Sequence, residues 1–439
     1  MTASSSSSAA SPATTADADI VVIGAGVVGT ACAVELSRGG RKVLVIDREM
    51  PGMGASFGHA GHIATEQVFP IANASMLWKI PRMLMDSTGP LRLDWRYLPK
   101  ATPWFLRLLW NMRAEPSRQA TSGLRALNEA SLAAWQSLLT DIDQTGLLKT
   151  EGSLLVHEKP DTAEELESIA KRMQAQGVPV ERFPREQVLA SAPELTEAIQ
   201  GALFFPDTAH VTDPHRLVEV LAHAAEQHGA RFVQADVTAG RVSDDGVRLE
   251  TSTGVITASQ VLIACGAHSA PLVEALSGVR VPLDTERGYH LMLPNELNRL
   301  PMAVTSLERS FIMTPMSQGL RLAGTVEFAG LERPANMDRA WQLERLAQGM
   351  FRRPLDIGEA TPWMGFRPSL PDSLPIIDRV GPGERLWLAF GHHHLGLTQA
   401  AITARLVGSF LDEGRTAYFT NPTEKALPPL ELYRLARFA

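Results

Sequence analysis

The 439-residue sequence is poor in cysteine and has no excess of positive charge. Its only cysteines are Cys32 and Cys265, which excludes a disulfide framework and a cysteine-based zinc site and suits a reducing compartment. Lysine and arginine total 41 against 48 aspartate and glutamate, a net charge of −7. No basic stripe of the kind that nucleic acid requires is visible, so we expect no nucleic-acid partner.

The sequence also has no recognisable targeting segment and no long uninterrupted apolar run. Residues 1–18 are rich in serine, alanine and threonine without a basic start or an apolar segment, so we expect a disordered tail and not a secretory signal. The most apolar stretch, 20–36, contains three glycines, and no transmembrane helix is predicted. These features predict a soluble cytoplasmic protein.

Residues 18–47 have the pattern strand, glycine turn, helix, strand. The turn contains Gly24, Gly26 and Gly29, and the helix starts at Val27 and Val28. The first glycine permits a tight turn, the second lets backbone N–H groups approach a pyrophosphate, and the third lets the helix lie close to the strand. The helix N-terminus favours an anion. The unit therefore predicts a dinucleotide site.

The acidic residue that ends the second strand narrows the choice of dinucleotide. Asp47, followed by Arg48, lies 18 residues after Gly29, close to where a carboxylate meets a ribose hydroxyl pair and not a 2′-phosphate. The cofactor should contain adenine and should not be NADP. This unit alone leaves FAD and NAD both open.

Alternating strand and helix signals at both ends, with a strand-rich part between them, predict the fold. We expect an α/β protein with a doubly wound, FAD-binding Rossmann-like domain and an inserted α+β substrate domain on an antiparallel sheet. The expected cofactor-domain segments are 19–85, 205–278 and 356–425, the substrate-domain segments are 86–204 and 279–355, and a C-terminal tail covers 426–439.

Individual elements follow from periodicity and from start and stop signals. Helices are expected at 124–143, 162–176, 214–229, 338–352 and 396–411, and strands at 152–157, 201–205, 231–234, 247–251, 255–257, 261–267 and 387–390. The apolar strand at 261–267 ends in small residues that include Gly266, as expected where a parallel strand abuts a ligand.

The stretch 78–113 is rich in tryptophan and basic residues, and prolines at 81, 90, 99 and 103 should cut it into short helical pieces. One interpretation is a cap over the active site that also contacts a membrane surface. The other is an insertion that packs its aromatic side chains on the domain beneath it. Binding to anionic liposomes separates the two.

Two further segments bear on chemistry. Arg367 lies between a glycine and a proline, on what should be an exposed turn, and its donor fork suits a substrate carboxylate. The alternative is a surface arginine paired with Asp372. Residues 391–398 read GHHHLGLT; three consecutive histidines seldom converge on one metal ion, so we predict no metal there and expect a helix N-terminus that faces developing negative charge.

Five motifs in order resemble the FAD-dependent D-amino-acid dehydrogenases of the D-amino-acid oxidase superfamily. After the glycine turn they are 54–61 (GASFGHAG), 287–290 (RGYH), 365–368 (GFRP) with 371–372, and 391–398. The strings at 282–290, 319–331 and 363–375 are similar to the branch that contains glyphosate oxidoreductase. The resemblance spans about residues 19–412 and implies FAD, which we expect to be held noncovalently.

The resemblance also implies roles for individual residues. The ADP half of FAD would be held by Gly24, Gly26, Gly29 and Asp47, the flavin ring would be lined by Ser56, Ala60 and Gly61, and its pyrimidine edge would meet Gly391, His393, Gly396, Leu397 and Thr398. Arg367 would contact the cofactor and bind the substrate carboxylate, with Tyr289 and His290 near the pocket.

This chain departs from the family pattern in three places. Asp47 replaces the commoner glutamate, His59 stands where asparagine is usual, and His393 stands where the family has glycine. A glycine at that position would reflect a positive φ or a close backbone approach. His59 or His290 is a candidate acceptor for the proton of the substrate ammonium group.

The predicted function is FAD-dependent oxidation of a D-amino acid, with hydride passing from the α-carbon to flavin N5 and the imine hydrolysing to a 2-oxo acid and an amine. The electron acceptor would be oxygen or a quinone. Alternatives are oxidation of N-substituted glycines such as sarcosine or glyphosate, of glycine itself, or of D-proline derivatives. A non-catalytic FAD-binding subunit and an NAD-linked dehydrogenase are further alternatives.

Overall fold

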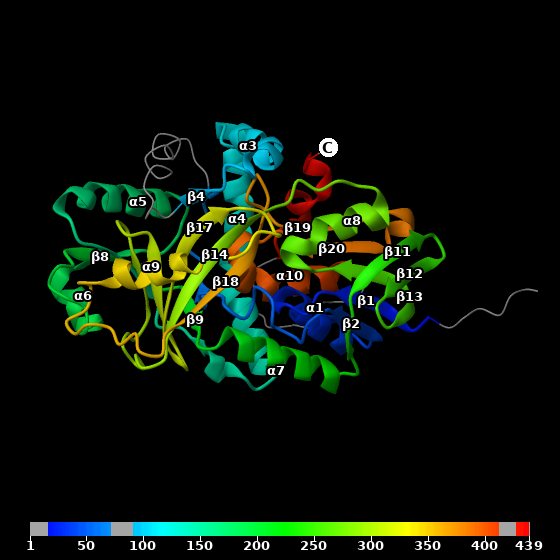
Figure 1. Cartoon of the computed structure of the whole chain (residues 1–439), viewed down its shortest axis with the longest axis horizontal. Helices are drawn as coiled ribbons and strands as arrows, with labels where there is room; N and C mark the ends of the chain where they lie inside the picture. The colour runs from blue at the N-terminus through cyan, green and yellow to red at the C-terminus, as the bar shows by residue number, and fades with distance from the viewer. Residues whose placement is uncertain (1–15, 72–90, 412–426, 439) are drawn as a thin grey trace, which may run out of the picture.

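The computed structural model of the chain describes residues 16–71, 91–411 and 427–438. Figure 1 shows two sheets side by side, one carrying the N-terminal strands and the other the central part of the chain. Residues 1–15 of the tail predicted at 1–18 and the stretch 72–90, which includes Trp78, lie outside the described residues, whereas Ala18, at the end of the predicted tail, is the first residue of a strand, β1 (Ala18–Ile23).

The first sheet has a parallel centre assembled from distant parts of the chain. Its central order is β10 (Arg231–Gln234), β2 (Val43–Asp47), β1 (Ala18–Ile23), β13 (Gly254–Ile263) and β20 (Leu386–Phe390). Antiparallel strands extend it, namely β12 (Gly246–Thr251), β11 (Val237–Ser243) and β19 (Ile376–Val380). In the sequence, the strands of this sheet are separated by segments that form the second sheet, as predicted.

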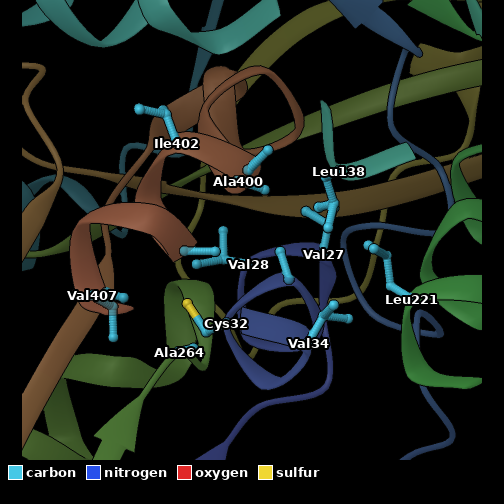
Figure 2. Packing of buried hydrophobic residues seen from close by; sticks show 14 of the residues in the cluster. Val27, Val28, Cys32, Val34, Leu138, Leu221, Ala264, Ala400, Ile402 and Val407 are labelled. Atoms are coloured by element: carbon cyan, nitrogen blue, oxygen red, sulfur yellow. The ribbon is translucent and has the colours of Figure 1, made fainter. Parts of the chain in front are cut away.

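Side chains of β1 alternate between two apolar cores. Ile20 and Val22 belong to the core on one face, where α1 (Val27–Arg38) packs on β1, α7 (Pro214–Gln227) and α10 (Gly396–Leu411) pack on α1, and α4 (Ala114–Asp141) packs on α10. Figure 2 shows this packing around α1, with Leu221 of α7 and Ala400 of α10 on either side. Val21 and Ile23 face the other core, which includes α8 (Ser269–Ser277). Both faces are covered, as a parallel sheet requires.

The second sheet is mostly antiparallel, with the order β18 (Thr361–Ser369), β14 (Asp284–Leu293), β17 (Gly319–Phe328), β16 (Phe311–Met316), β15 (Ala303–Ser306), β6 (Ser153–His157), β8 (Gly201–Phe205) and β7 (Glu181–Pro184). The contacts of β15 with β6 and of β17 with β4 (Leu91–Leu93) are parallel. The helices α5 (Ala163–Ala175), α6 (Arg185–Ser191) and α9 (Asp338–Ala347) accompany it (Figure 1). A small sheet joins β3 (His62–Ile63), β9 (Ala209–Val211) and β5 (Leu148–Lys149).

Most predicted elements are confirmed, with differences at their ends. Helix α10 and strand β8 have the predicted bounds, α4 starts at Ala114 and not at 124, and α9 ends at Ala347 and not at 352. The strands predicted at 255–257 and 261–267 are one continuous strand, β13, because polar Ser259 and Gln260 divide an apolar pattern without breaking the backbone pairing.

The proline-rich stretch differs from prediction in its described part. Residues 98–111 form a single helix, α3 (Leu98–Asn111), with Pro103 inside it, so this proline does not cut the stretch into pieces. Buried Trp104 donates its indole N–H to the Ser369 carbonyl (3.0 Å) and packs edge-on against Phe105. This tertiary anchoring offsets the backbone hydrogen bond that Pro103 removes. Within the described ranges, no helix is both long and apolar enough to cross a membrane.

Candidate active site

The glycine turn has the geometry that its sequence predicts. Gly24 has φ +110°, and a Cβ there would lie 2.5 Å from the Ala264 carbonyl oxygen. A Cβ on Gly29 would lie 1.9 Å from the Gly24 carbonyl oxygen, so α1 approaches the turn as closely as the backbone allows. The packing reasons given for these two glycines are confirmed.

Two side chains organise the N-terminus of α1. Asp47 accepts hydrogen bonds from the backbone N–H groups of Ala25 (2.6 Å) and Glu49 (3.1 Å). The Ser56 hydroxyl accepts one from the Val27 N–H (2.9 Å). Ser56 therefore lies at the start of the helix, where the pyrophosphate is expected, whereas the resemblance placed it only along the flavin ring. A carboxylate has acceptor sites beyond these two bonds, so Asp47 still suits a ribose hydroxyl.

A cavity of about 1050 Å³ runs from this turn to the second sheet. It is large for a small-molecule pocket, which suits a dinucleotide together with a small substrate. The predicted site residues that line it are Gly24, Gly26, Val27, Val28, Asp47, Arg48, Ser56, His59, Ala60, Gly266, Tyr289, Arg367, His393, Gly396 and Leu397.

Five predicted residues do not line the cavity but support residues that do. They are Gly29, Gly61, His290, Gly391 and Thr398. Gly61 and Gly391 have φ of +76° and +87°, and a Cβ on either would lie within 2.8 Å of a neighbouring atom. The Thr398 hydroxyl accepts a hydrogen bond from the Ala64 N–H (3.0 Å), which ties α10 to the segment after β3.

His290 lies behind residues of the cavity and does not line it. Its ring stacks on Trp363 (centroids 5.0 Å apart), and Nδ1 lies 2.9 Å from the Gly58 carbonyl oxygen. Burial lowers the pKa of His290 to about 3. This position does not bring the imidazole to a substrate bound in the cavity, and the expectation that His290 takes a substrate proton is not supported by the geometry.

His59 lines the cavity, but both of its ring nitrogens are engaged. Nδ1 accepts a hydrogen bond from the Gly61 N–H (3.1 Å), so Nε2 carries the proton and donates to the His394 carbonyl (3.1 Å). Burial, opposed by that backbone bond, lowers the pKa of His59 to about 4. A neutral ring with both nitrogens occupied is a poor proton acceptor.

Tyr289 is among the residues that line the cavity, and its hydroxyl is bound to neighbouring residues. The hydroxyl donates to Glu327 (2.6 Å) and accepts from the Asn336 N–H (3.2 Å). Burial and the bond to Glu327 raise the pKa of Tyr289 to about 12. We assign the ring a packing role in the pocket.

Arg367 lies in a strand and not on an exposed turn. It belongs to β18, directly opposite Glu286 of β14, and its Nη1 donates to the Thr325 carbonyl (3.2 Å). Burial lowers the pKa of Arg367 from its ordinary value, an effect that nearby Glu286 opposes. The turn expectation is wrong because Gly365 and Pro368 mark close packing in a strand, where a Cβ on Gly365 would meet Trp363 at 2.0 Å.

Arg367 keeps donors free for a ligand. Among the described residues it makes no ion pair within 4 Å, and its only hydrogen bond is the one to Thr325. Asp372, the alternative partner, pairs with Arg437 instead (2.5 Å), so that alternative is wrong. The remaining guanidinium N–H groups border the cavity, where a carboxylate would accept them in pairs.

His393 occupies a position that suits glycine, and its side chain makes contacts that a glycine could not make. Its φ is +53°, so of the two alternatives given for a glycine at this position the positive φ is the one observed. Nε2 accepts a hydrogen bond from the Leu370 N–H (2.9 Å), so Nδ1 carries the proton and faces Glu286 Oε1 at 3.8 Å. The histidine thus links the end of β18 to the loop before α10.

Glu286 is a cavity residue that the sequence reasoning missed. It is 3% exposed, and its Oε1 accepts a hydrogen bond from the Ser369 hydroxyl (2.8 Å). Burial opposes its ionisation, but His393, Arg367 and Ser369 together bring the pKa of Glu286 below its usual value. The available signal was the alternation in β14, which places Glu286 and Gly288 on one face of the strand.

The start of α10 faces the cavity through Gly396 and Leu397. Its position is fixed by Trp135, whose indole N–H donates to the Leu397 carbonyl (2.8 Å), and by His392, whose Nε2 lies 3.0 Å from the Thr403 hydroxyl. In the part of the chain that the structure describes, no group of three or more His, Cys, Asp or Glu side chains is arranged to hold a metal ion.

Comparisons with known proteins agree with this geometry. Residues 19–409 match the family described as FAD dependent oxidoreductase. The chain is 33% identical over 400 residues to a D-amino-acid oxidase of Bradyrhizobium diazoefficiens, covering 89% of this chain and 94% of that protein. It is 32% identical over 410 residues to a D-amino acid dehydrogenase of Paramagnetospirillum magneticum, again covering 89% and 94%.

Solved structures with the same fold include glycine oxidase from Geobacillus kaustophilus, with a TM-score of 0.70, 22% identity and coverage of 94% of this chain and 99% of that one. Iminodiacetate oxidase from Chelativorans has a TM-score of 0.67 and 22% identity, covering 94% and 98%. The glycine turn, the second helix N-terminus and the cavity between them are the features that an FAD-binding chain of this fold needs, and the protein belongs to the FAD-dependent oxidoreductase family.

Proposed function

We propose that the protein oxidises the C–N bond of a D-amino acid, or of a related amino or imino acid, and that Arg367 binds the substrate carboxylate. The observation that carries the proposal is the free donor edge of Arg367 in a cavity continuous with the dinucleotide turn. The names of the relatives that cover most of the chain support the same substrate class.

The residues divide the work between cofactor and substrate. The N–H groups at the start of α1, with Asp47 and Arg48, would hold the ADP half of FAD, and the start of α10 would stabilise negative charge at the other end. When bound, FAD supplies the two-electron acceptor for the oxidation. Arg367 would orient the α-carbon through the carboxylate, and Trp363 would contribute apolar surface to the cavity lining.

His59 and His290, the predicted acceptors of the substrate ammonium proton, are neutral, and their ring nitrogens are bound to the backbone. We therefore propose that the ammonium group loses its proton to solvent before the substrate binds. Oxidation of a neutral amine requires positioning more than a dedicated base. This assignment predicts that activity rises with pH as the fraction of free amine in solution increases.

Anaerobic reduction of the flavin tests the proposal. The purified protein is mixed without oxygen with D-amino acids, D-proline derivatives, glycine, sarcosine and glyphosate, and bleaching of the flavin absorbance is followed. Bleaching by D-amino acids supports the proposal. Bleaching only by N-substituted glycines would show that these, and not D-amino acids, are the substrate class. A flavin that no amine bleaches indicates a non-catalytic FAD-binding subunit. Reoxidation by oxygen or by a quinone identifies the acceptor.

We further propose that α3 contacts an anionic membrane surface. Its outer face exposes Leu106, Leu109 and Trp110, and Trp95 precedes it, while Trp104 packs inward. Exposed basic side chains accompany them at 92, 96, 100, 107 and 113. Apolar residues flanked by basic ones favour the headgroup region of an anionic bilayer.

Co-sedimentation with anionic liposomes tests the contact. Binding that salt weakens and that Trp110→Ala with Leu106→Ala reduces supports it. Val255→Ala, at an exposed apolar position on β13, is the matched control. Equal sedimentation with neutral and anionic liposomes, or none with either, contradicts the proposal.

A further inference from the structure

Strand β17 contains a bulge beside Arg367. Its pairing with β14 shifts between Arg287, opposite Glu327, and Tyr289, opposite Gly324. Gly288 alone therefore faces two residues of β17, Thr325 and Val326. A bulge of this kind re-aims the backbone at one point of a sheet.

Thr325 is strained at this bulge. Its φ is +60°, a region that a β-branched residue seldom enters. The residue is 3% exposed, and its buried hydroxyl oxygen has no hydrogen-bond partner among the described residues. Both features destabilise the fold, and such backbone conformations concentrate at functional sites, where the surrounding structure holds them.

The bulge directs the Thr325 carbonyl to the guanidinium of Arg367. That carbonyl accepts the Nη1 hydrogen bond at 3.2 Å. In an unbulged antiparallel pair, backbone carbonyls point at the neighbouring strand or away from it in the plane of the sheet. The strained conformation thus gives Arg367 its only hydrogen bond within the described residues.

Gly288, across from the bulge, supplies the surface on which the guanidinium lies. A Cβ on Gly288 would lie 2.5 Å from Nη2, 2.6 Å from Cζ and 2.7 Å from Nε of Arg367. The near-equal distances to three guanidinium atoms show that the group lies flat against the Gly288 backbone. Gly288 is not at positive φ, so backbone conformation does not require glycine here, and the close approach of Arg367 does.

We propose that Thr325 and Gly288 are positioning residues that hold the Arg367 guanidinium in the orientation that binds a substrate carboxylate. This inference rests on the proposed function, in which Arg367 is the carboxylate anchor. Gly288 fixes the plane of the guanidinium and the Thr325 carbonyl fixes its rotation, which leaves the opposite donor edge aimed into the cavity. A group ordered before binding loses less freedom when the ligand arrives.

Gly288→Ala tests whether the close approach of the Arg367 guanidinium to the Gly288 backbone is needed for binding, and it changes no charge. Binding of pyruvate to the FAD-loaded enzyme is measured by calorimetry, with pyruvamide as an uncharged counterpart. The added Cβ displaces the flexible end of Arg367, so we expect the pyruvate Kd to rise roughly 10-fold or more, because a displaced guanidinium loses charge-assisted hydrogen bonds to the carboxylate. The pyruvamide Kd should change less than about threefold, because a neutral amide gains little from the guanidinium.

Gly146→Ala is the matched control. Gly146 is exposed, is not at positive φ, and has nothing within 4 Å of an added Cβ, so pyruvate binding should equal that of the wild type. A Gly288→Ala enzyme that binds pyruvate like the control overturns the inference.

Thr325→Gly tests the bulge and protects against a folding failure. Glycine adopts φ +60° freely and keeps the carbonyl, so we expect an unchanged or higher melting temperature and a pyruvate Kd within about threefold of the wild type. A loss of pyruvate binding as large as that of Gly288→Ala would assign the effect to the threonine side chain and overturn the role of the carbonyl.

Arg367→Ala separates this inference from the proposed function. If Arg367→Ala leaves the pyruvate Kd unchanged, the carboxylate anchor is wrong and both proposals fail. If Arg367→Ala abolishes pyruvate binding while Gly288→Ala does not weaken it, the proposed function stands and the positioning role is refuted.

Discussion

Buried neutral histidines should make the protein sensitive to mild acid. Burial lowers the pKa of His59 and His210 to about 4, and that of His290, His392 and His394 to about 3, from an ordinary 6.5. As the pH falls below 6.5, these histidines become protonated in the unfolded chain but stay neutral in the folded chain. Stability from these groups is therefore complete above pH 6.5 and is lost as the pH falls toward the folded-state values.

The expected loss is large. A histidine whose folded-state pKa is far below 5.5 loses about 1.4 kcal/mol of unfolding free energy between pH 7.5 and pH 5.5. Five such residues, taken as independent, give about 7 kcal/mol, which is comparable with the whole stability of an ordinary domain. Carboxylates contribute little in this window because their ordinary pKa values lie below it.

Urea unfolding of the protein with excess FAD, followed by tryptophan fluorescence at pH 7.5 and 5.5, measures this loss. His210→Gln should remove about 1.4 kcal/mol of the pH dependence, because His210 is buried in β9 next to His62 and Lys149 and lies outside the cavity lining. His223→Gln, at an exposed position of α7, is the control and should leave the pH dependence unchanged. A wild-type protein that is equally stable at both pH values would refute the reasoning.

Three further outcomes follow from single contacts. Arg367→Ala should raise the KM of the best substrate by roughly 100-fold or more with flavin content unchanged, since an ionised bidentate contact is lost; equal kinetics would show that another group binds the carboxylate. Gly29→Ala should yield protein without flavin or without a stable fold, because the added Cβ would lie 1.9 Å from the Gly24 carbonyl oxygen; a flavin-loaded variant contradicts this. Trp135→Phe should lower the unfolding free energy by about 0.5–1.5 kcal/mol, because the indole N–H no longer donates to the carbonyls of Leu397 and Thr398 at the start of α10, as urea unfolding would show, whereas an unchanged midpoint would indicate that the indole hydrogen bonds contribute nothing to stability.

The dinucleotide half of the site was predictable because it is local. The turn at Gly24, the helix after it and the strand to Asp47 are contiguous, and both the positive φ of Gly24 and the close approach of Gly29 to the Gly24 carbonyl lie within this unit. The left-handed backbone at His393 was also predictable, since a position that suits glycine carries information about φ even when another residue occupies it.

The substrate half was not predictable in the same way because it depends on register between distant strands. Nothing near Glu286 in sequence indicates that Arg367, 81 residues later, lies opposite it. The bulge at Thr325 also depends on pairing with β14, and threonine is a residue that propensity would place in a regular strand. His290 was assigned to the pocket by its neighbours in a motif, and it lies on the same face of β14 as Glu286, but its ring stacks on Trp363, and Trp363 and not His290 lines the cavity.

The link from His393 to Leu370 and Glu286 constrains how this chain can change over generations. Glycine at 393 would relieve the backbone but would leave the buried Leu370 N–H without its acceptor and Glu286 without the imidazole beside it. Replacing Glu286 first would leave the Nδ1 proton of His393 facing no negative charge. Each single step removes one partner of the contact between His393 and Glu286 and leaves the other without it, so the cost of the double exchange should be less than the sum of the two single costs, and we expect residues 286 and 393 to form an epistatic pair. Lineages that carry one of them should carry the other, and substitutions at the two positions should occur close together in time.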